Sequence, residues 1–307
     1  MKVHIGVKTD PVEYRYSYEW LFALMKSLSL THVQLGSFFE LYMLEDGYFR
    51  DLRKTADSFG VSIKSCFTSH RELGGFFTDN SYLEKAARSA YERLIHAASL
   101  LGADYAGSSP GFVYRDKPHL KARGIACYLS HMKELTMLAK EKGLKALTLE
   151  PMSCFAEPPS TPGELDYILG EAADWHNKNL NTSVPLLVCG DISHGYADSQ
   201  KRVVHDNMDL FVHQIPHMAE FHFKNTDGIF NATFGFSPEE QKRGKVDLRE
   251  LKNIIDVNET RFPAEDVAGY FETSGPKLGR DYSDRSLEAI LVSSLTEIKK
   301  VFCPDPA

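Results

Sequence analysis

The stretch that decides the fold runs from KALTLEP (145–151) through TPGELDYILGEAADWHNKN (161–179) to VPLLVCGD (184–191). Two short apolar segments flank a longer amphipathic one, which is the pattern of a strand–helix–strand unit with parallel strands. Thr161 and Pro162 suit the N-cap and the first position of the intervening helix. This part of the chain therefore predicts a parallel α/β sheet.

The same alternation extends in both directions from this unit. It gives eight predicted strands: VHIGVKT (3–9), HVQLGSF (32–38), VSIKSCFTS (61–69), ADYAGSS (103–109), KALTLEP (145–151), VPLLVCGD (184–191), AEFHFKN (219–225) and VAGYFET (267–273). Gly60, Gly102 and Gly143 fall between a helical pattern and the next strand, where C-cap glycines are expected. Eight units favour a closed (β/α)8 TIM barrel over an open doubly wound sheet. Because no linker or composition break divides the chain, we expect one barrel domain over residues 1–307.

The composition narrows the classes of partner. A net charge of −7 argues against nucleic acid, because binding phosphates needs a basic face. The five cysteines form no CxxC pair, so neither a disulfide framework nor a cysteine zinc site is indicated. No run approaches the roughly 20 apolar residues of a membrane span, and no signal-peptide pattern opens the chain. We therefore expect a cytoplasmic protein without membrane partners, and leave open whether it forms a homo-oligomer.

Potential metal ligands lie at or near the ends of the last four predicted strands. They are Glu150, Asp191, His222 and Glu272. Taken singly, each residue could have a purely structural role. A carboxylate just after a strand often caps a helix or forms a salt bridge, and a histidine within a strand is often a hydrogen-bonded core residue. Four of them would converge at one end of a barrel, where buried negative charge is costly without a cation. This set predicts one divalent metal, with Mn²⁺, Mg²⁺, Co²⁺ and Zn²⁺ all open.

The pattern Glu…Asp-x-x-His…His…Glu carries a family resemblance. It is formed by LEP (149–151), DISH (191–194), FHF (221–223) and FET (271–273). It resembles the sugar-phosphate isomerase/epimerase superfamily of xylose isomerase-like barrels, and within it the ketose 3-epimerases. The stretches IGVKTDPVEYRYS, RELGGFF, EPMSCFAEPP, HFKNTD and SGPKLGRDYSD are also similar to the tetrulose-phosphate epimerase/racemase of bacterial erythritol catabolism.

The resemblance implies a metal-dependent epimerase or isomerase that acts on a small ketose or ketose phosphate. In such enzymes the first and last glutamates are both metal ligands and proton carriers, which here are Glu150 and Glu272. One removes the proton next to the carbonyl to give a metal-stabilised enediolate, and the other returns a proton to the opposite face. A sugar-acid or inosose dehydratase, and less so an endonuclease IV-like hydrolase, are the alternatives.

The residues expected to contact the substrate are less sharply defined. His194 matches a substrate-contacting histidine of the family, and Glu157 resembles a supporting acid or is an exposed loop acid. The simpler epimerases carry an arginine several residues after the metal-binding histidine, whereas this chain departs from them with Lys224, Asn225 and Asp227. His70, after the third predicted strand, is a further candidate to line the pocket. For a phosphate, the segment SGPKLGRDYSD (274–284) offers Lys277 and Arg280 beside two glycines, although solvated cations are the alternative reading. The insert FNATFGFSPEEQKRGK (230–245) is read as an ordered lid or as a solvated loop.

Overall fold

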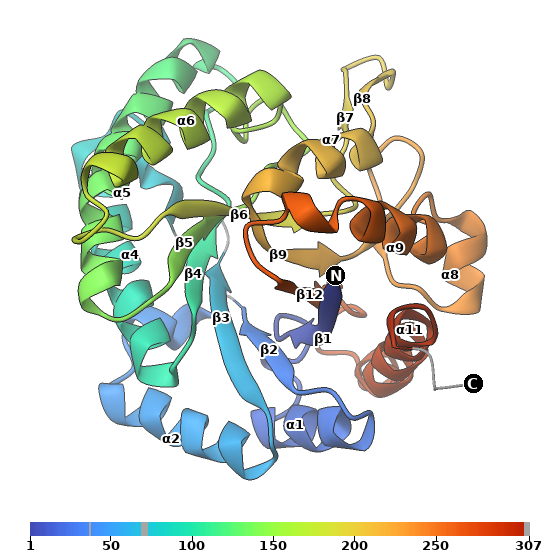
Figure 1. The fold of residues 1–307 in the computed structure, drawn as a ribbon. Helices are drawn as coiled ribbons and strands as arrows, with labels where there is room; N and C mark the ends of the chain where they lie inside the picture. Colours follow the sequence, from blue (N-terminus) through green and yellow to red (C-terminus); the bar gives the residue numbers. More distant parts are fainter. Residues whose placement is uncertain (37, 69–72, 304–307) are drawn as a thin grey trace. The chain divides into compact units, whose positions relative to one another are not determined.

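The computed structural model describes residues 1–36, 38–68 and 73–303. Eight strands close into a barrel in the order β1-β12-β9-β6-β5-β4-β3-β2, and their succession along the chain can be followed in Figure 1. The strands are β1 (Lys2–Lys8), β2 (His32–Leu35), β3 (Ser62–Thr68), β4 (Tyr105–Ser108), β5 (Ala146–Leu149), β6 (Leu186–Asp191), β9 (Met218–Phe223) and β12 (Asp266–Phe271). All eight predicted strands and the predicted TIM barrel are confirmed.

Helices follow the strands along the chain, as predicted. They are α1 (Tyr18–Ser27), α2 (Asp46–Ser58), α4 (Ser81–Leu101), α5 (Lys121–Glu141), α6 (Pro162–Lys178), α7 (Asn207–Gln214), α8 (Pro238–Arg243), α9 (Leu248–Val257), α10 (Asp281–Asp284) and α11 (Leu287–Phe302). The Thr161 side chain caps α6 by accepting from the Glu164 N–H at 3.3 Å, and Gly102 ends α4 with a φ of 74°. Among the described residues, no helix combines the length and apolar character needed to cross a membrane.

The chain divides into two compact units. The first comprises Met1–Phe38, Lys54–Ile63 and Gly190–Ala307, and the second comprises Phe39–Arg53 and Lys64–Cys189. In the first unit β1 pairs in parallel with both β2 and β12, and β12 pairs in parallel with β9. In the second, β4 pairs in parallel with β3 and β5. Apolar side chains from these strands are buried in the core of each unit.

The insert after β9 forms an ordered substructure of the first unit. β10 (Asn225–Thr226) and β11 (Thr233–Phe234) pair antiparallel, and the buried Asn225 amide oxygen accepts hydrogen bonds from the N–H groups of Thr226 and Val246 at 2.9 and 3.0 Å. Phe236 is buried, and its N–H donates to Ser294 of α11 at 2.9 Å. A second small hairpin joins β7 (Tyr196–Ala197) to β8 (Val203–His205). The insert is thus not a solvated loop, while its predicted lid function stays a prediction.

Glycine at position 6 of β1 lets neighbouring strands approach closely. A Cβ built there would lie 2.5 Å from the His32 carbonyl oxygen and 2.6 Å from the Tyr270 ring. We therefore expect Gly6→Ala to lower the free energy of unfolding by about 1–3 kcal/mol, measured by urea denaturation with circular dichroism.

Gly170 of α6 has open space around its Cβ position. Gly170→Ala should raise stability by about 0.5–1 kcal/mol. Equal losses in both variants would contradict this packing account.

Candidate active site

Three potential metal ligands converge within the first unit. Asp191 is the last residue of β6, His222 lies within β9, and Glu272 directly follows β12. The pairing of β12 with β9 brings the ends of these strands together, and the Glu272 N–H donates to the Phe223 carbonyl at 3.1 Å. One ligand atom from each residue lies within 4.8 Å of those of the other two. Asp191 is only 1% exposed and His222 is 0% exposed, so both leave water on folding.

Two lysines partly balance the charge of these carboxylates. The Lys224 ammonium lies 3.3 Å from Asp191 Oδ2 and 3.2 Å from Glu272 Oε2, while Lys8 lies 3.0 Å from Glu272 Oε1. Burial opposes ionisation of Glu272, but Lys224, Lys8 and His222 together hold its pKa well below the usual value. Burial likewise opposes ionisation of Asp191, but the charges of His194 and Lys224 lower its pKa below the usual value. Both carboxylates are therefore anionic at neutral pH.

The His222 ring is held between an amide and the two carboxylates. Its Nε2 lies 2.7 Å from Gln34 Oε1, and its Nδ1 lies 3.0 Å from Glu272 Oε2 and 4.0 Å from Asp191 Oδ2. If Nε2 donates its proton to Gln34, Nδ1 is left to face the carboxylates. A bare nitrogen lone pair facing carboxylate oxygens is repulsive, so either a proton or a metal ion must lie between them.

Asp191 has one oxygen that suits a metal. Its Oδ1 accepts the N–H of Ser193 at 2.7 Å, which fixes the carboxylate. Its Oδ2 is buried and accepts no hydrogen bond from the described residues, and its charged neighbours are the Lys224 ammonium at 3.3 Å and His194 Nε2 at 3.4 Å. A buried anionic oxygen is costly without hydrogen bonds, so a metal ion there would add to the charge that Lys224 supplies. The donor set of two carboxylates and one imidazole matches what divalent ions bind.

The other predicted site residues lie in several places. Glu150 is buried and directly follows β5 in the second unit, where its N–H donates to the Ser108 carbonyl at 3.2 Å. Glu157 lies in the loop after β5 of the same unit. A hydrogen bond to Cys154, and to a smaller extent the charge of Glu157, raise the pKa of the Arg115 guanidinium. The predicted pocket residue His70 lies outside the described residues.

The predicted phosphate loop belongs to the first unit. Lys277 and Arg280 are exposed, and neither side chain forms an ion pair within the described ranges. Gly275 and Gly279 have φ angles of 66° and 79°, which favour glycine. Asp284 anchors the loop by accepting the Gly279 N–H at 3.0 Å. Both basic side chains thus project from an anchored loop into solvent.

Sequence reasoning gave neither Gln34 nor Lys8 a role beside the metal ligands. Lys8 follows Val7 at the end of β1, and Gln34 lies between Val33 and Leu35 in β2, so each is a polar residue beside apolar ones. That local contrast was the available signal for both. In the loop after β1, the buried Glu13 accepts a hydrogen bond from the Thr9 hydroxyl at 2.7 Å, and Asp10 forms an ion pair with Lys8 at 3.1 Å. The charged cluster therefore extends into the loop after β1.

Comparison with known proteins assigns the chain to a family. Residues 22–262 match the sequence model of the xylose isomerase-like TIM barrel. A protein provisionally identified as a xylose isomerase from Rhodospirillum rubrum ATCC 11170 is 18% identical with a TM-score of 0.78, covering 97% of this chain and 99% of that one. A D-psicose 3-epimerase from Clostridium cellulolyticum H10, crystallised with D-tagatose, is 16% identical with a TM-score of 0.65, covering 98% and 99%.

A third solved structure, of the IOLI protein with a bound zinc atom, is 14% identical with a TM-score of 0.69, covering 99% of this chain and 100% of that one. At these identities the structural likeness establishes the fold alone. No curated protein matches the sequence.

The buried Glu13 gives a pH prediction. Burial, and after it the charge of Asp10, raise the pKa of Glu13 from 4.5 to about 8. Between these values the folded state keeps a proton that the unfolded chain has lost, so stability falls as pH rises, by at most about 1.4 kcal/mol per pH unit. Glu13→Gln should flatten this decline between about pH 5 and 8 in urea denaturation curves. The exposed Glu19→Gln serves as the control; a wild-type slope in Glu13→Gln would refute the assignment.

Proposed function

Because the chain belongs to the xylose isomerase-like TIM barrel family, we propose that it is a divalent-metal-dependent epimerase or isomerase of a small ketose or ketose phosphate. The observation that carries the proposal is the group formed by the buried Asp191 and His222 and the partly buried Glu272, whose ligand atoms lie within 4.8 Å of one another. Active sites of such barrels lie at the carboxyl ends of the strands, where these residues are found.

The proposed metal ligands are Glu150, Asp191, His222 and Glu272. Support for Glu150 comes from the strand order, in which β5 is the neighbour of β6, and from the burial of Glu150 directly after β5. Three carboxylates and one imidazole suit Mn²⁺, Mg²⁺ or Co²⁺, and also Zn²⁺, the ion bound in the similar IOLI structure. When bound, the ion would polarise the substrate carbonyl and so acidify the neighbouring C–H bond.

Glu272 and Glu150 are the proposed proton carriers. Glu272 is ionised at neutral pH because its pKa is held low against burial, chiefly by Lys224, so it can accept a proton. Inversion needs a second proton carrier on the opposite face of the substrate, and Glu150, buried directly after β5, is proposed for that role. Removal of a proton by one and its return by the other inverts the carbon through a planar intermediate.

The lysines and His194 are proposed to hold the substrate in place. Lys224 lies between Asp191 and Glu272, so its ammonium can donate to a substrate oxygen while it keeps both carboxylates ionised. His194 is 9% exposed and lies beside Asp191, so its ring can reach a neighbouring hydroxyl. In the second unit Glu157 is proposed as a supporting acid. Together these polar groups suit a hydroxyl-rich substrate, and the resemblance to the tetrulose-phosphate epimerases is the reason to propose a tetrulose.

A phosphorylated substrate is favoured by the loop at 274–284. Lys8 and Lys224 are engaged by carboxylates, whereas Lys277 and Arg280 project from a loop with two glycines of positive φ. Exposed cations in a loop after the last barrel strand are suited to a phosphate. We therefore propose that Lys277 and Arg280 bind the phosphate of a tetrulose phosphate.

Removal of Glu272 as a proton carrier gives the first test of this function. In Glu272→Gln we expect exchange of the carbon-bound proton of a tetrulose phosphate in D2O, followed by NMR, to fall about 10²–10⁴-fold. Asp191→Asn should instead weaken metal binding, so excess Mn²⁺ should restore part of its exchange. The exposed Glu288→Gln is the matched control. Unchanged exchange in Glu272→Gln would overturn its proposed role.

The phosphate contact is tested separately by kinetics. The double variant Lys277→Ala, Arg280→Ala should raise KM for a tetrulose phosphate about 10- to 100-fold, because charge-assisted hydrogen bonds are lost, and leave the KM of the free tetrulose unchanged. Arg285→Ala in the same segment is the control, since that cation is paired with Asp281 at 3.0 Å. Equal effects on both substrates would exclude a phosphate-specific contact.

A further inference from the structure

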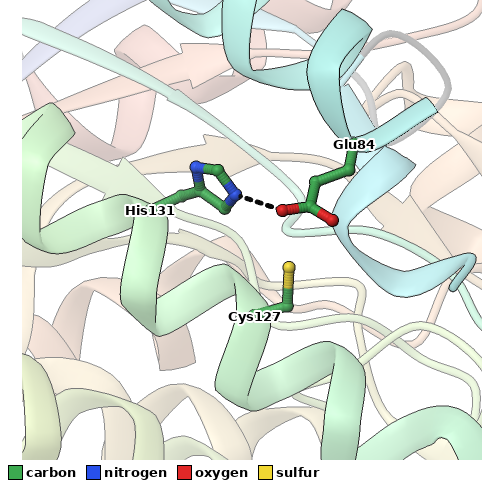
Figure 2. A group of neighbouring side chains, drawn as sticks. All are labelled: Glu84, Cys127 and His131. Carbon is green, nitrogen blue, oxygen red and sulfur yellow. Dashed lines mark hydrogen bonds and ion pairs between the residues drawn. The ribbon is translucent and has the colours of Figure 1, made fainter. Parts of the chain in front are cut away.

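Three metal-binding side chains lie together outside the proposed active site, between α4 and α5. Glu84 reaches from the first turn of α4 toward Cys127 and His131 of α5, as Figure 2 shows. Residues four apart on a helix share one face, so Cys127 and His131 both point at Glu84. Each residue offers one ligand atom, and these atoms lie within 4.8 Å of one another. The cluster therefore joins a thiol, an imidazole and a carboxylate.

The cluster is held in position by its surroundings. His131 Nε2 lies 2.8 Å from Glu84 Oε1, and the His131 ring stacks on Phe76 at a centroid distance of 4.5 Å. The hydrogen bond from His131 lowers the pKa of Glu84, so its carboxylate is anionic. Burial, and after it Glu84, raise the pKa of Cys127 to about 11, so the thiol keeps its proton until a cation displaces it.

We propose that Glu84, Cys127 and His131 bind a Zn²⁺ ion. Zinc binds thiolate, imidazole and carboxylate at about 2.0–2.3 Å, which places ligand atoms of a tetrahedral site roughly 3.3–3.8 Å apart. To bind the ion, the 2.8 Å contact would open and the longer separations, all within 4.8 Å, would close to this range. The thiolate and the carboxylate balance the two charges of the ion, and binding releases the Cys127 proton to solvent.

A neighbouring cavity leaves room for the fourth ligand. Glu84 and Cys127 line a cavity of about 270 Å³, which is large enough for a water molecule. Arg123 also lines it, but its guanidinium is paired with Asp79 at 2.6 Å, which reduces its repulsion of a metal ion. With three protein ligands and a water, the proposed ion would tie α4 to α5.

The thiol distinguishes this cluster from the residues at the strand ends. Glu150, Asp191, His222 and Glu272 include no sulfur, so Co²⁺ bound to them gives no thiolate-to-metal charge transfer. Co²⁺ accepts the same tetrahedral ligands as Zn²⁺ and reports a bound thiolate by a charge-transfer band in the near ultraviolet. The zinc proposal can therefore be tested independently of the proposed function.

The experiment is a Co²⁺ titration of the full chain, followed by near-ultraviolet absorption. We expect the wild type to develop the thiolate band, and one equivalent of Zn²⁺ to bleach it. Cys127→Ser should abolish the band, and His131→Gln should weaken it. The exposed Cys303→Ser, a matched control, should keep it. Far-ultraviolet circular dichroism confirms that each variant is folded.

Two results would overturn the zinc site. One is the absence of the band in the wild type, in which case His131 and Glu84 serve only as an ion pair between two helices. The other is a band that persists in Cys127→Ser, which would place the thiolate at another cysteine. Metal content by mass spectrometry gives a second readout, because Cys127→Ser should lose one equivalent of Zn²⁺ while retaining its proton-exchange activity.

Discussion

Compensation of buried negative charge is the constraint on which the proposed active site depends. Asp191 and Glu272 are brought together where β6 and β12 end, and burial alone would disfavour both anions. Lys8 and Lys224 supply positive charge at 3.0–3.3 Å, and His222 lies within the same group. One buried carboxylate oxygen still accepts no hydrogen bond from the described residues. A divalent cation would complete this charge balance and could polarise the carbonyl group of a substrate.

The two proposed metal sites differ because their ligands come from different elements. Strand ends bring together carboxylates and an imidazole from residues far apart in sequence, and this hard donor set suits ions that activate a sugar carbonyl. The helices α4 and α5 bring together one thiol, one imidazole and one carboxylate, a softer set that suits Zn²⁺. Ligand type thus favours a hard ion that activates a carbonyl in one place and Zn²⁺ in the other.

Much of the fold was predictable because strand and helix periodicities are local in the sequence. The strands predicted at 145–151 and 267–273 extended too far at their carboxyl ends, because the chain leaves the sheet before Glu150 and Glu272. The contact between Gln34 and His222 joins residues 188 positions apart, and that between Glu84 and His131 spans 47. No local pattern encodes such tertiary contacts, so sequence reasoning missed both. The metal, the substrate and the phosphate contact stay predictions.

The central claim is that one divalent ion binds between the carboxylates and the imidazole at the strand ends. Anomalous diffraction from crystals grown with Mn²⁺ tests it most directly. The account predicts a peak about 2.0–2.6 Å from Asp191 Oδ2, His222 Nδ1 and a Glu272 oxygen, with Glu150 as the fourth ligand. Absence of a peak there, with Lys224 and Lys8 as the only counter-charges, would contradict it.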